Sequence, residues 1–189
     1  MLTAALLSPI LARAPNTRKL IPALSPSNLS TLDLTALEAT IVPDANTINY
    51  YLEWFTNWLG APRGTLAALA RIESNYNAET GSFLNVRNHV GATGLMQLMD
   101  IARADIRQHY GANIDPYNPI QSIVAAALMF VINYTYLTRN NVPNISWAAL
   151  VVAYNGGWTA GRTYAQTGIA PSDEGRNYVA QWQSLTGQA

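Results

Sequence analysis

The stretch NPIQSIVAAALMFVINYTYL, residues 118–137, decides the fold class, because it joins the start signals of a helix to a body that is apolar on nearly every face. Asn118 is a typical N-cap, Pro119 fits the first helical position, and Gln121 at N3 makes a variant of the capping box. A helix that is apolar all round is buried by other elements. We therefore expect this stretch to be the central helix of a domain.

The segments around this helix also show helical spacing. Five of them combine an apolar stripe with a start or stop signal: 47–59 before Gly60, 62–74 opened by Pro62, 100–110 capped by Asp100 and ended by Gly111, 147–157 capped by Ser146, and a last segment capped by Ser172 with Tyr178, Trp182 and Leu185 on one face. No stretch shows a sustained two-residue alternation, so at most a small hairpin is expected between Gly81 and Gly94. The fold class is expected to be mostly α.

Residues 1–46 differ in composition from the rest of the chain. They are rich in Pro, Ser, Thr and Asn, and their short apolar fragments show no sustained period. We interpret them as an extended N-terminal arm or linker that docks on a partner, and residues 47–189 as a single domain. The start of the chain has a short apolar stretch, but it lacks a basic n-region and is interrupted by Pro9, so a signal peptide is not favoured.

Composition excludes several functional classes. Charged residues make up 12% of the 189 residues, about half the usual share of roughly 25%, which favours a compact globular body. Eleven basic and eleven acidic residues cancel, so no overall field attracts nucleic acid or anionic lipid. Cysteine is absent and the two histidines, His89 and His109, are not spaced as a metal pair, so no metal or cofactor is expected. The longest apolar runs, 123–132 and 147–153, are shorter than the roughly 20 residues that span a bilayer.

One acid stands where the helical pattern requires a core residue. In LAALARIESNYNAE, residues 66–79, an apolar stripe formed by Leu66, Leu69 and Ala70 continues to Glu73 at i+7. Burial and the negative end of the helix dipole would both raise the pKa of this carboxyl, which could then act as a general acid. The alternative is a boundary glutamate whose side chain turns to solvent.

Two further stretches combine glycines with isolated polar groups. GATGLMQLMD, residues 91–100, places Gln97 alone among apolar residues, and it could equally be a tight turn before a helix. AYNGG, residues 153–157, ends a buried helix in Tyr154, Asn155 and paired glycines, which could be an ordinary helix C-terminus with a polar tip. Neither stretch identifies a chemistry by itself.

Taken together, four motifs resemble those of the lytic transglycosylases with a lysozyme-like fold. They follow in the family's order: ES at 73–74, GATGLMQLM at 91–99, AYNGG at 153–157 and EGRNYV at 174–179. The resemblance covers roughly residues 60–185 and implies a single all-α, lysozyme-like catalytic domain behind the N-terminal arm. It also implies an enzyme, a carbon–oxygen lyase that cleaves the MurNAc–GlcNAc β-1,4 bond of peptidoglycan without a cofactor or metal.

The resemblance implies that one carboxylate performs both proton transfers. Glu73 would protonate the leaving glycosidic oxygen and then accept the proton of the C6 hydroxyl of the same MurNAc, which closes a 1,6-anhydro ring. No water is consumed, so the second carboxylate of a hydrolytic glycosidase is not required.

Substrate-binding residues also follow from the resemblance. They are Ser82 near an N-acetyl group, Met96 and Gln97 along the glycan groove, Tyr154 and Asn155 beside Glu73 and the sugar, and Glu174 and Tyr178 in the floor. The sequence departs from the family pattern at three points: FLNVRNHV at 83–90 lengthens the link after Ser82, Asp100 replaces the usual Pro, and Gly175 stands where Thr is common.

Two alternatives to a transglycosylase stay open. A goose-type hydrolytic lysozyme shares the fold and the glutamate, and a catalytically inactive structural protein shares the fold alone. For the setting, the arm favours a phage virion component that penetrates murein during genome ejection and acts in the host periplasm, with residues 1–46 bound to other virion proteins. The alternative is a bacterial periplasmic enzyme of a secretion or conjugation apparatus, with an export signal in residues 1–14. No direct nucleic-acid or membrane-spanning role is expected.

Overall fold

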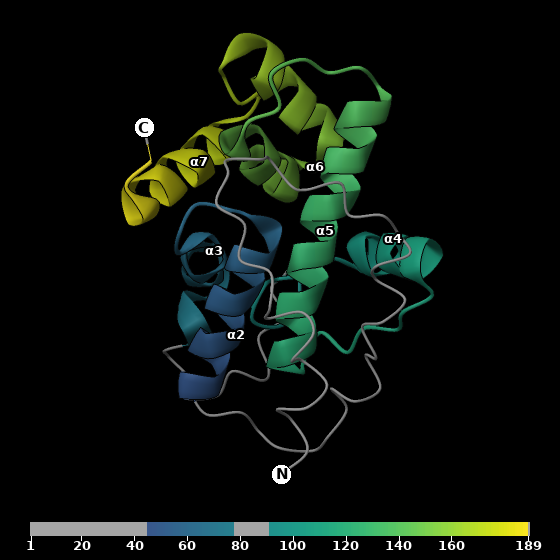
Figure 1. Ribbon diagram of the computed structural model, residues 1–189, viewed down its shortest axis with the longest axis vertical. Coiled ribbons are helices and arrows are strands. Elements are labelled where there is room, and N and C mark those ends of the chain that lie inside the picture. The colour runs from purple at the N-terminus through teal and green to yellow at the C-terminus, as the bar shows by residue number, and fades with distance from the viewer. Residues whose placement is uncertain (1–44, 78–90, 189) are drawn as a thin grey trace.

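The computed structural model describes residues 45–77 and 91–188, and these residues fold into six α-helices without a β-strand (Figure 1). The helices are α2 (Ala45–Leu59), α3 (Thr65–Ser74), α4 (Asp100–Tyr110), α5 (Pro119–Arg139), α6 (Trp147–Thr167) and α7 (Asp173–Thr186), and the short 3-10 helix η3 (Asn75–Asn77) follows α3. The mostly α fold class is therefore confirmed. The predicted arm, residues 1–46, lies outside the described residues except for its last two, which belong to α2.

Helix α5 is the central helix, as its sequence predicts. In Figure 1 it runs through the middle of the molecule, and it packs against α2, α3, α4 and α6. Asn118 caps it by accepting hydrogen bonds from the N–H groups of Ile120 and Gln121. The predicted capping box is wrong in one detail, because Gln121 Oε1 accepts from the N–H of Asp115 (2.8 Å) rather than from the N-cap residue. Gln121 thus fixes the loop that leads into α5.

The 21-residue helix α5 is long and apolar enough to cross a membrane by length and composition alone. Most of its apolar window is buried inside the fold by the surrounding helices. It is the one helix of this kind within residues 45–77 and 91–188, and its burial is typical of the core helix of a globular domain.

Helix α3 begins against α2 and α7. Pro62 was expected to open it, but α3 begins at Thr65, and the carbonyl of Pro62 accepts hydrogen bonds from the N–H and hydroxyl of Thr65. Thr56 of α2 accepts from the N–H of Leu66 (3.2 Å), and the indole of Trp182 in α7 donates to the Thr65 hydroxyl (3.3 Å). These buried bonds fix the start of α3 and therefore the direction of its last turn, which carries Glu73.

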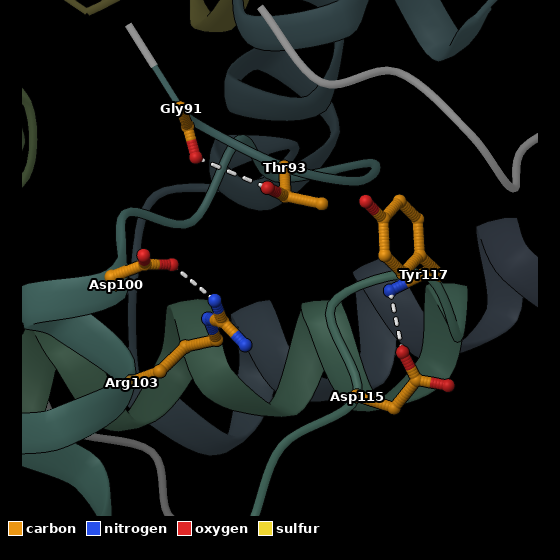
Figure 2. Close-up of polar contacts among 6 residues, drawn as sticks. All are labelled: Gly91, Thr93, Asp100, Arg103, Asp115 and Tyr117. Carbon is orange, nitrogen blue, oxygen red and sulfur yellow. Dashed lines mark hydrogen bonds and ion pairs between the residues drawn. The ribbon is translucent and has the colours of Figure 1, made fainter.

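Helix α4 begins differently from the prediction. Asp100 was expected to be its N-cap, but the N-cap is Met99 and Asp100 is the first helical residue. Figure 2 shows the Asp100 carboxylate pointing toward Arg103, with which it forms an ion pair one turn along the helix. The end of α4 agrees with the prediction, because Gly111 adopts the left-handed conformation (φ 69°) typical of a C-terminal glycine.

Two tight loops near α4 are held by short-range bonds, which Figure 2 also shows. The Thr93 hydroxyl donates to the carbonyl of Gly91 (3.1 Å), and the Asp115 carboxylate accepts from the N–H of Tyr117 (3.0 Å). The second bond, from a backbone N–H two residues further along the chain, is typical of an aspartate that begins a turn. Both loops are therefore locally ordered.

Helices α6 and α7 begin at the predicted caps, since Ser146 accepts from the N–H of Ala149 and Ser172 from that of Gly175. The predicted end of α6 at residue 157 is wrong. The helix kinks at Gly157 (φ 79°, ψ 168°) and continues to Thr167. This combination of angles is open almost only to glycine, so the paired glycines bend the helix instead of ending it.

Candidate active site

Glu73 lies in the last turn of α3, on the side that faces α7. The helix ends abruptly because Asn75 and Tyr76 both have positive φ angles (47° and 55°), and the N–H of Asn75 bonds back to the carbonyls of Ala70 and Arg71. The neighbouring Ser74 hydroxyl donates to the carbonyl of Leu95 (2.8 Å), which ties the end of α3 to the glycine-containing loop. The backbone beneath the Glu73 side chain is therefore fixed from two directions.

The carboxyl of Glu73 is only partly exposed, and burial raises its pKa from an ordinary value of 4.5 to about 7. The negative charge of Glu174 acts in the same direction, whereas the hydrogen bond from Tyr178 opposes the rise. A carboxyl with a pKa of about 7 exists in both forms near neutral pH, so it can give a proton and take one back.

Tyr178 of α7 holds Glu73 in place. Its hydroxyl donates to Glu73 Oε1 (2.5 Å), and the residue as a whole is 5% exposed. Burial raises the pKa of Tyr178 well above its ordinary value, and the charge of Glu73 raises it further. The phenol therefore stays protonated and remains a donor at neutral pH.

The loop over residues 91–99 forms a tight, glycine-dependent turn. The N–H groups of Thr93 and Leu98 each donate to the carbonyl of the other (3.1 and 2.9 Å), which forms an isolated antiparallel β-bridge. Most of the region where a small hairpin was predicted, residues 81–90, lies outside the described residues. A Cβ at Gly94 would lie 1.8 Å from the carbonyl oxygen of Pro116, so only glycine fits there. Gln97 adopts a positive φ (47°) and donates through Nε2 to the Gly94 carbonyl (2.8 Å).

The two loop residues that were assigned to the groove have opposite placements. Gln97 lines the larger of the two cavities described below. Met96 does not, because its side chain is fully buried in the core. Its backbone is nevertheless part of the site's support, since its carbonyl accepts from the Tyr154 hydroxyl (2.8 Å) and its N–H donates to Ser122.

Tyr154, Asn155 and Glu174 complete the surroundings of the carboxyl. Burial raises the pKa of Tyr154 well above its ordinary value and the charge of Glu73 adds to this, which places the phenol within the electrostatic reach of that acid. Asn155 Nδ2 donates to Glu174 Oε1 (3.2 Å), so α6 and α7 meet at the rim. We call Glu73, Asn155, Glu174 and Tyr178 the acid end of the groove.

Two cavities meet at the acid end. The larger has a volume of about 650 Å³ and extends from Glu73 between α4, α5 and α6, and the smaller has about 250 Å³ and lies over Tyr178 and Gln181 of α7. Glu73, Asn155 and Glu174 line both of them. The titratable carboxyl thus lies partway along an elongated groove, where it can reach a bond in the middle of a chain-like ligand.

Part of the wall of the larger cavity is formed by residues that sequence reasoning missed. We call them the aromatic end: Met129, Asn133 and Tyr136 of α5 and Trp158 of α6. A signal was present, because Asn133 is a polar residue inside a helix that is otherwise apolar on nearly every face. Periodicity could not place it, since a helix buried all round has no outward stripe.

The structure therefore brings together six of the predicted site residues, namely Glu73, Gln97, Tyr154, Asn155, Glu174 and Tyr178. It separates Met96 from the groove, and Ser82 lies outside the described residues. Within the described part of the chain, no group of three His, Cys, Asp or Glu side chains is arranged to hold a metal ion.

Comparison with protein families gives one match. The model of the transglycosylase SLT domain matches residues 56–174, well over half of the chain. The matched range begins within α2 and ends at Glu174, so it contains Glu73, the 91–99 loop and the AYNGG motif. Comparison with curated proteins and with solved structures gave no match.

Proposed function

We propose a specific reaction for this chain on one premise: it belongs to the transglycosylase SLT domain family, whose members are lytic transglycosylases acting on peptidoglycan. The helical body has the lysozyme-like fold of that family. The finer proposal is that the chain cleaves the MurNAc–GlcNAc β-1,4 bond without water and leaves a 1,6-anhydroMurNAc end. The observation that carries it is the Glu73 carboxyl, which has a pKa of about 7 and lies where the two cavities meet.

In the first step, protonated Glu73 donates its proton to the glycosidic oxygen. The bond from that oxygen to C1 of MurNAc breaks, the GlcNAc portion leaves as an alcohol, and positive charge develops at C1 and the ring oxygen. Glu73 is now a carboxylate beside this charge. Its pKa of about 7 suits the step, because a group with a pKa close to the working pH both holds its proton and releases it readily.

In the second step, the Glu73 carboxylate accepts the proton of the MurNAc C6 hydroxyl while the C6 oxygen bonds to C1. The acid is regenerated and the 1,6-anhydro ring closes, so neither water nor another reactant enters the balance. Tyr178 acts as a positioning residue, because its hydrogen bond fixes one carboxylate oxygen. Gln97 and Asn155 lie on the groove wall and are proposed to contact the sugars.

The test is product analysis on purified peptidoglycan. We expect the wild-type chain to release muropeptides with anhydro ends, and Glu73→Gln, which keeps the shape of the side chain, to release none. Glu53→Gln is the matched control, because Glu53 is an exposed acid on α2 away from the groove. Reducing ends instead of anhydro ends would show a hydrolytic, goose-type enzyme, and undiminished release by Glu73→Gln would exclude Glu73 as the acid.

We further propose that the enzyme opens murein locally as a component of a phage virion. The support is the sequence of residues 1–46, whose composition suits a segment bound by other virion proteins. The alternatives are a periplasmic enzyme of a secretion apparatus and an inactive structural protein. Mass spectrometry of purified virions and of a periplasmic fraction distinguishes the first two, and the product assay above distinguishes the third.

A further inference from the structure

The loop beside the groove contains a four-residue turn that ends at Gln97. The N–H of Gln97 donates to the carbonyl of Gly94 (3.2 Å), so the two central residues of the turn are Leu95 and Met96. Both central side chains are fully buried, which anchors the turn in the core. Gln97 lines the larger cavity, and it is the residue of this turn whose amide is proposed above to contact the sugars.

Three side chains from three different helices bond to the backbone of the two central residues. The Ser74 hydroxyl of α3 donates to the Leu95 carbonyl (2.8 Å), and the Tyr154 hydroxyl of α6 donates to the Met96 carbonyl (2.8 Å). From α5, the Ser122 hydroxyl oxygen accepts from the Met96 N–H (3.1 Å). The N–H and the carbonyl of Met96 are therefore each held by one side chain.

Ser122 is placed by the first turn of α5 and lies outside the groove. It is fully buried and lines neither cavity. A Cβ at Gly94 would lie 3.5 Å from Ser122 Oγ, so the turn packs directly against the start of α5. Because the bond from the Met96 N–H is buried, removal of the serine oxygen would leave that N–H without this partner, at a cost in free energy.

The backbone conformation of Gln97 requires support. Its φ of 47° lies in the left-handed region, which is uncommon for residues other than glycine and persists only where the surrounding structure imposes it. The bond from Gln97 Nε2 to the Gly94 carbonyl lies within the turn and would move with it. By contrast, Tyr154 fixes the peptide group that enters Gln97, and Ser122 fixes the peptide group before that one.

We propose that Ser122 is a positioning residue for the reaction: by holding the Met96 N–H, it keeps Gln97 in its left-handed conformation and thus keeps the Gln97 amide on the groove wall. Ser74 is adjacent to Glu73 in the chain, and Tyr154 lies within the electrostatic reach of that acid. Ser122 is therefore the one of the three side chains whose effect can be measured apart from the acid. The inference rests on the proposed function for the ligand of Gln97, whereas its conformational part does not.

The first measurement is the backbone conformation of Gln97 in solution, which needs no ligand. By NMR, the cross-relaxation peak between the Gln97 amide proton and its own Hα is strong at positive φ, because the two protons are then close. We expect a strong peak in the wild-type chain and a weakened one in Ser122→Ala. Ser146→Ala is the matched control and should keep the strong peak, because Ser146 also accepts from one backbone N–H at 3.1 Å but lines neither cavity. A folded Ser122→Ala protein with the wild-type peak overturns the proposal.

The second measurement tests whether Ser122 acts through Gln97. In the Glu73→Gln chain, which prevents turnover, calorimetry measures the binding of chitotetraose, a soluble oligomer of GlcNAc. We expect Gln97→Ala to weaken binding about tenfold and Ser122→Ala about fivefold, as for a hydrogen bond that is lost or misplaced. The double variant should bind as weakly as Gln97→Ala alone, because the serine has no effect without the amide that it positions.

Equal weakening by Ser122→Ala with and without the Gln97 amide would overturn the proposal, and so would binding that Gln97→Ala leaves unchanged. Ser146→Ala should change binding by less than about twofold in either background. If Ser122→Ala does not fold, Ser122→Cys decides, since it keeps the size of the side chain with a weaker acceptor: wild-type results in both measurements would overturn the role. No bond is cleaved in these assays, so failure of the positioning role and failure of the proposed reaction, which product analysis tests, are distinguishable.

Discussion

The two ends of the groove are built on opposite principles. At the acid end the carboxyl of Glu73 accepts from Tyr178, and Asn155 donates to Glu174, so polar groups meet polar groups. At the aromatic end the lining is mainly apolar, with Met129, Tyr136 and Trp158 around the buried amide of Asn133. The first arrangement controls where a proton sits, and the second presents a mainly apolar surface to a ligand. The difference separates chemistry from recognition along one surface.

The largest expected effect is a loss of turnover when the acid end is changed. Glu73→Gln should lower kcat by about 10³-fold, because it removes the acid and base of both steps, while binding of chitotetraose stays within about twofold of wild type. Steady-state rates on soluble glycan fragments, with calorimetry, measure both. If Glu73→Gln lost binding as well, the acid would not be confined to chemistry.

The second effect concerns stability. The folded protein raises the pKa of Glu73 to about 7, so the native state holds this proton more tightly than the unfolded chain does. The stabilising contribution is fully present below pH 4.5 and is lost as pH rises through about 7. Its full size is about 3 kcal/mol in the free energy of unfolding.

Urea unfolding of wild type and of Glu73→Gln at pH 4.5 and pH 8.5 measures this loss. We expect the variant to gain about 3 kcal/mol relative to wild type between the two pH values, because it carries no titrating group at the site. Glu53→Gln, at an exposed position, should show no such gain. An equal difference between wild type and Glu73→Gln at both pH values would mean that the carboxyl is not destabilised by burial.

The sequence predicts the acid end better than the aromatic end, for physical reasons. Glu73 interrupts an amphipathic stripe, so its inward position is visible in the pattern, and the caps Ser146 and Ser172 follow from local chemistry. The bond from Tyr178 spans 105 positions of chain, and only the resemblance could suggest it. Asn133 is hidden because an all-apolar helix has no period to break.

The errors of prediction have local causes. Met96 and Gln97 are adjacent, and the positive φ of Gln97 turns its amide toward the groove while Met96 points into the core. The AYNGG motif contains paired glycines, which are the usual signal of a helix end. Gly157 instead produces a kink, because the chain after it returns to helical geometry and continues to Thr167. Asp100 lies one position too late to cap α4. In each case tertiary packing decides between conformations that the residue allows.

The third effect is a shift in pH dependence. Tyr178→Phe removes a bond that lowers the pKa of Glu73, so that pKa should rise above 7 and the fall of kcat/KM at high pH should move to higher pH. The rate at the optimum should fall about tenfold, because the carboxyl loses its fixed orientation. A pH–rate profile from pH 4 to pH 9 measures both. A fall in rate without a shift would mean that the hydroxyl supports packing only.

The smallest effect belongs to the aromatic end. Trp158→Leu keeps an apolar surface but removes the ring that stacks on Tyr136, so it should raise KM about threefold to fivefold. Since an apolar wall away from the reacting bond should contribute equally to the binding of substrate and transition state, kcat should stay unchanged. The pH profile should also stay that of wild type, because Trp158 is absent from the groups that shift the pKa of Glu73. A changed kcat or a displaced high-pH limb of the profile would show that the two ends are coupled. Helix α6 would then connect them, because it carries Asn155 before the kink at Gly157 and Trp158 directly after it.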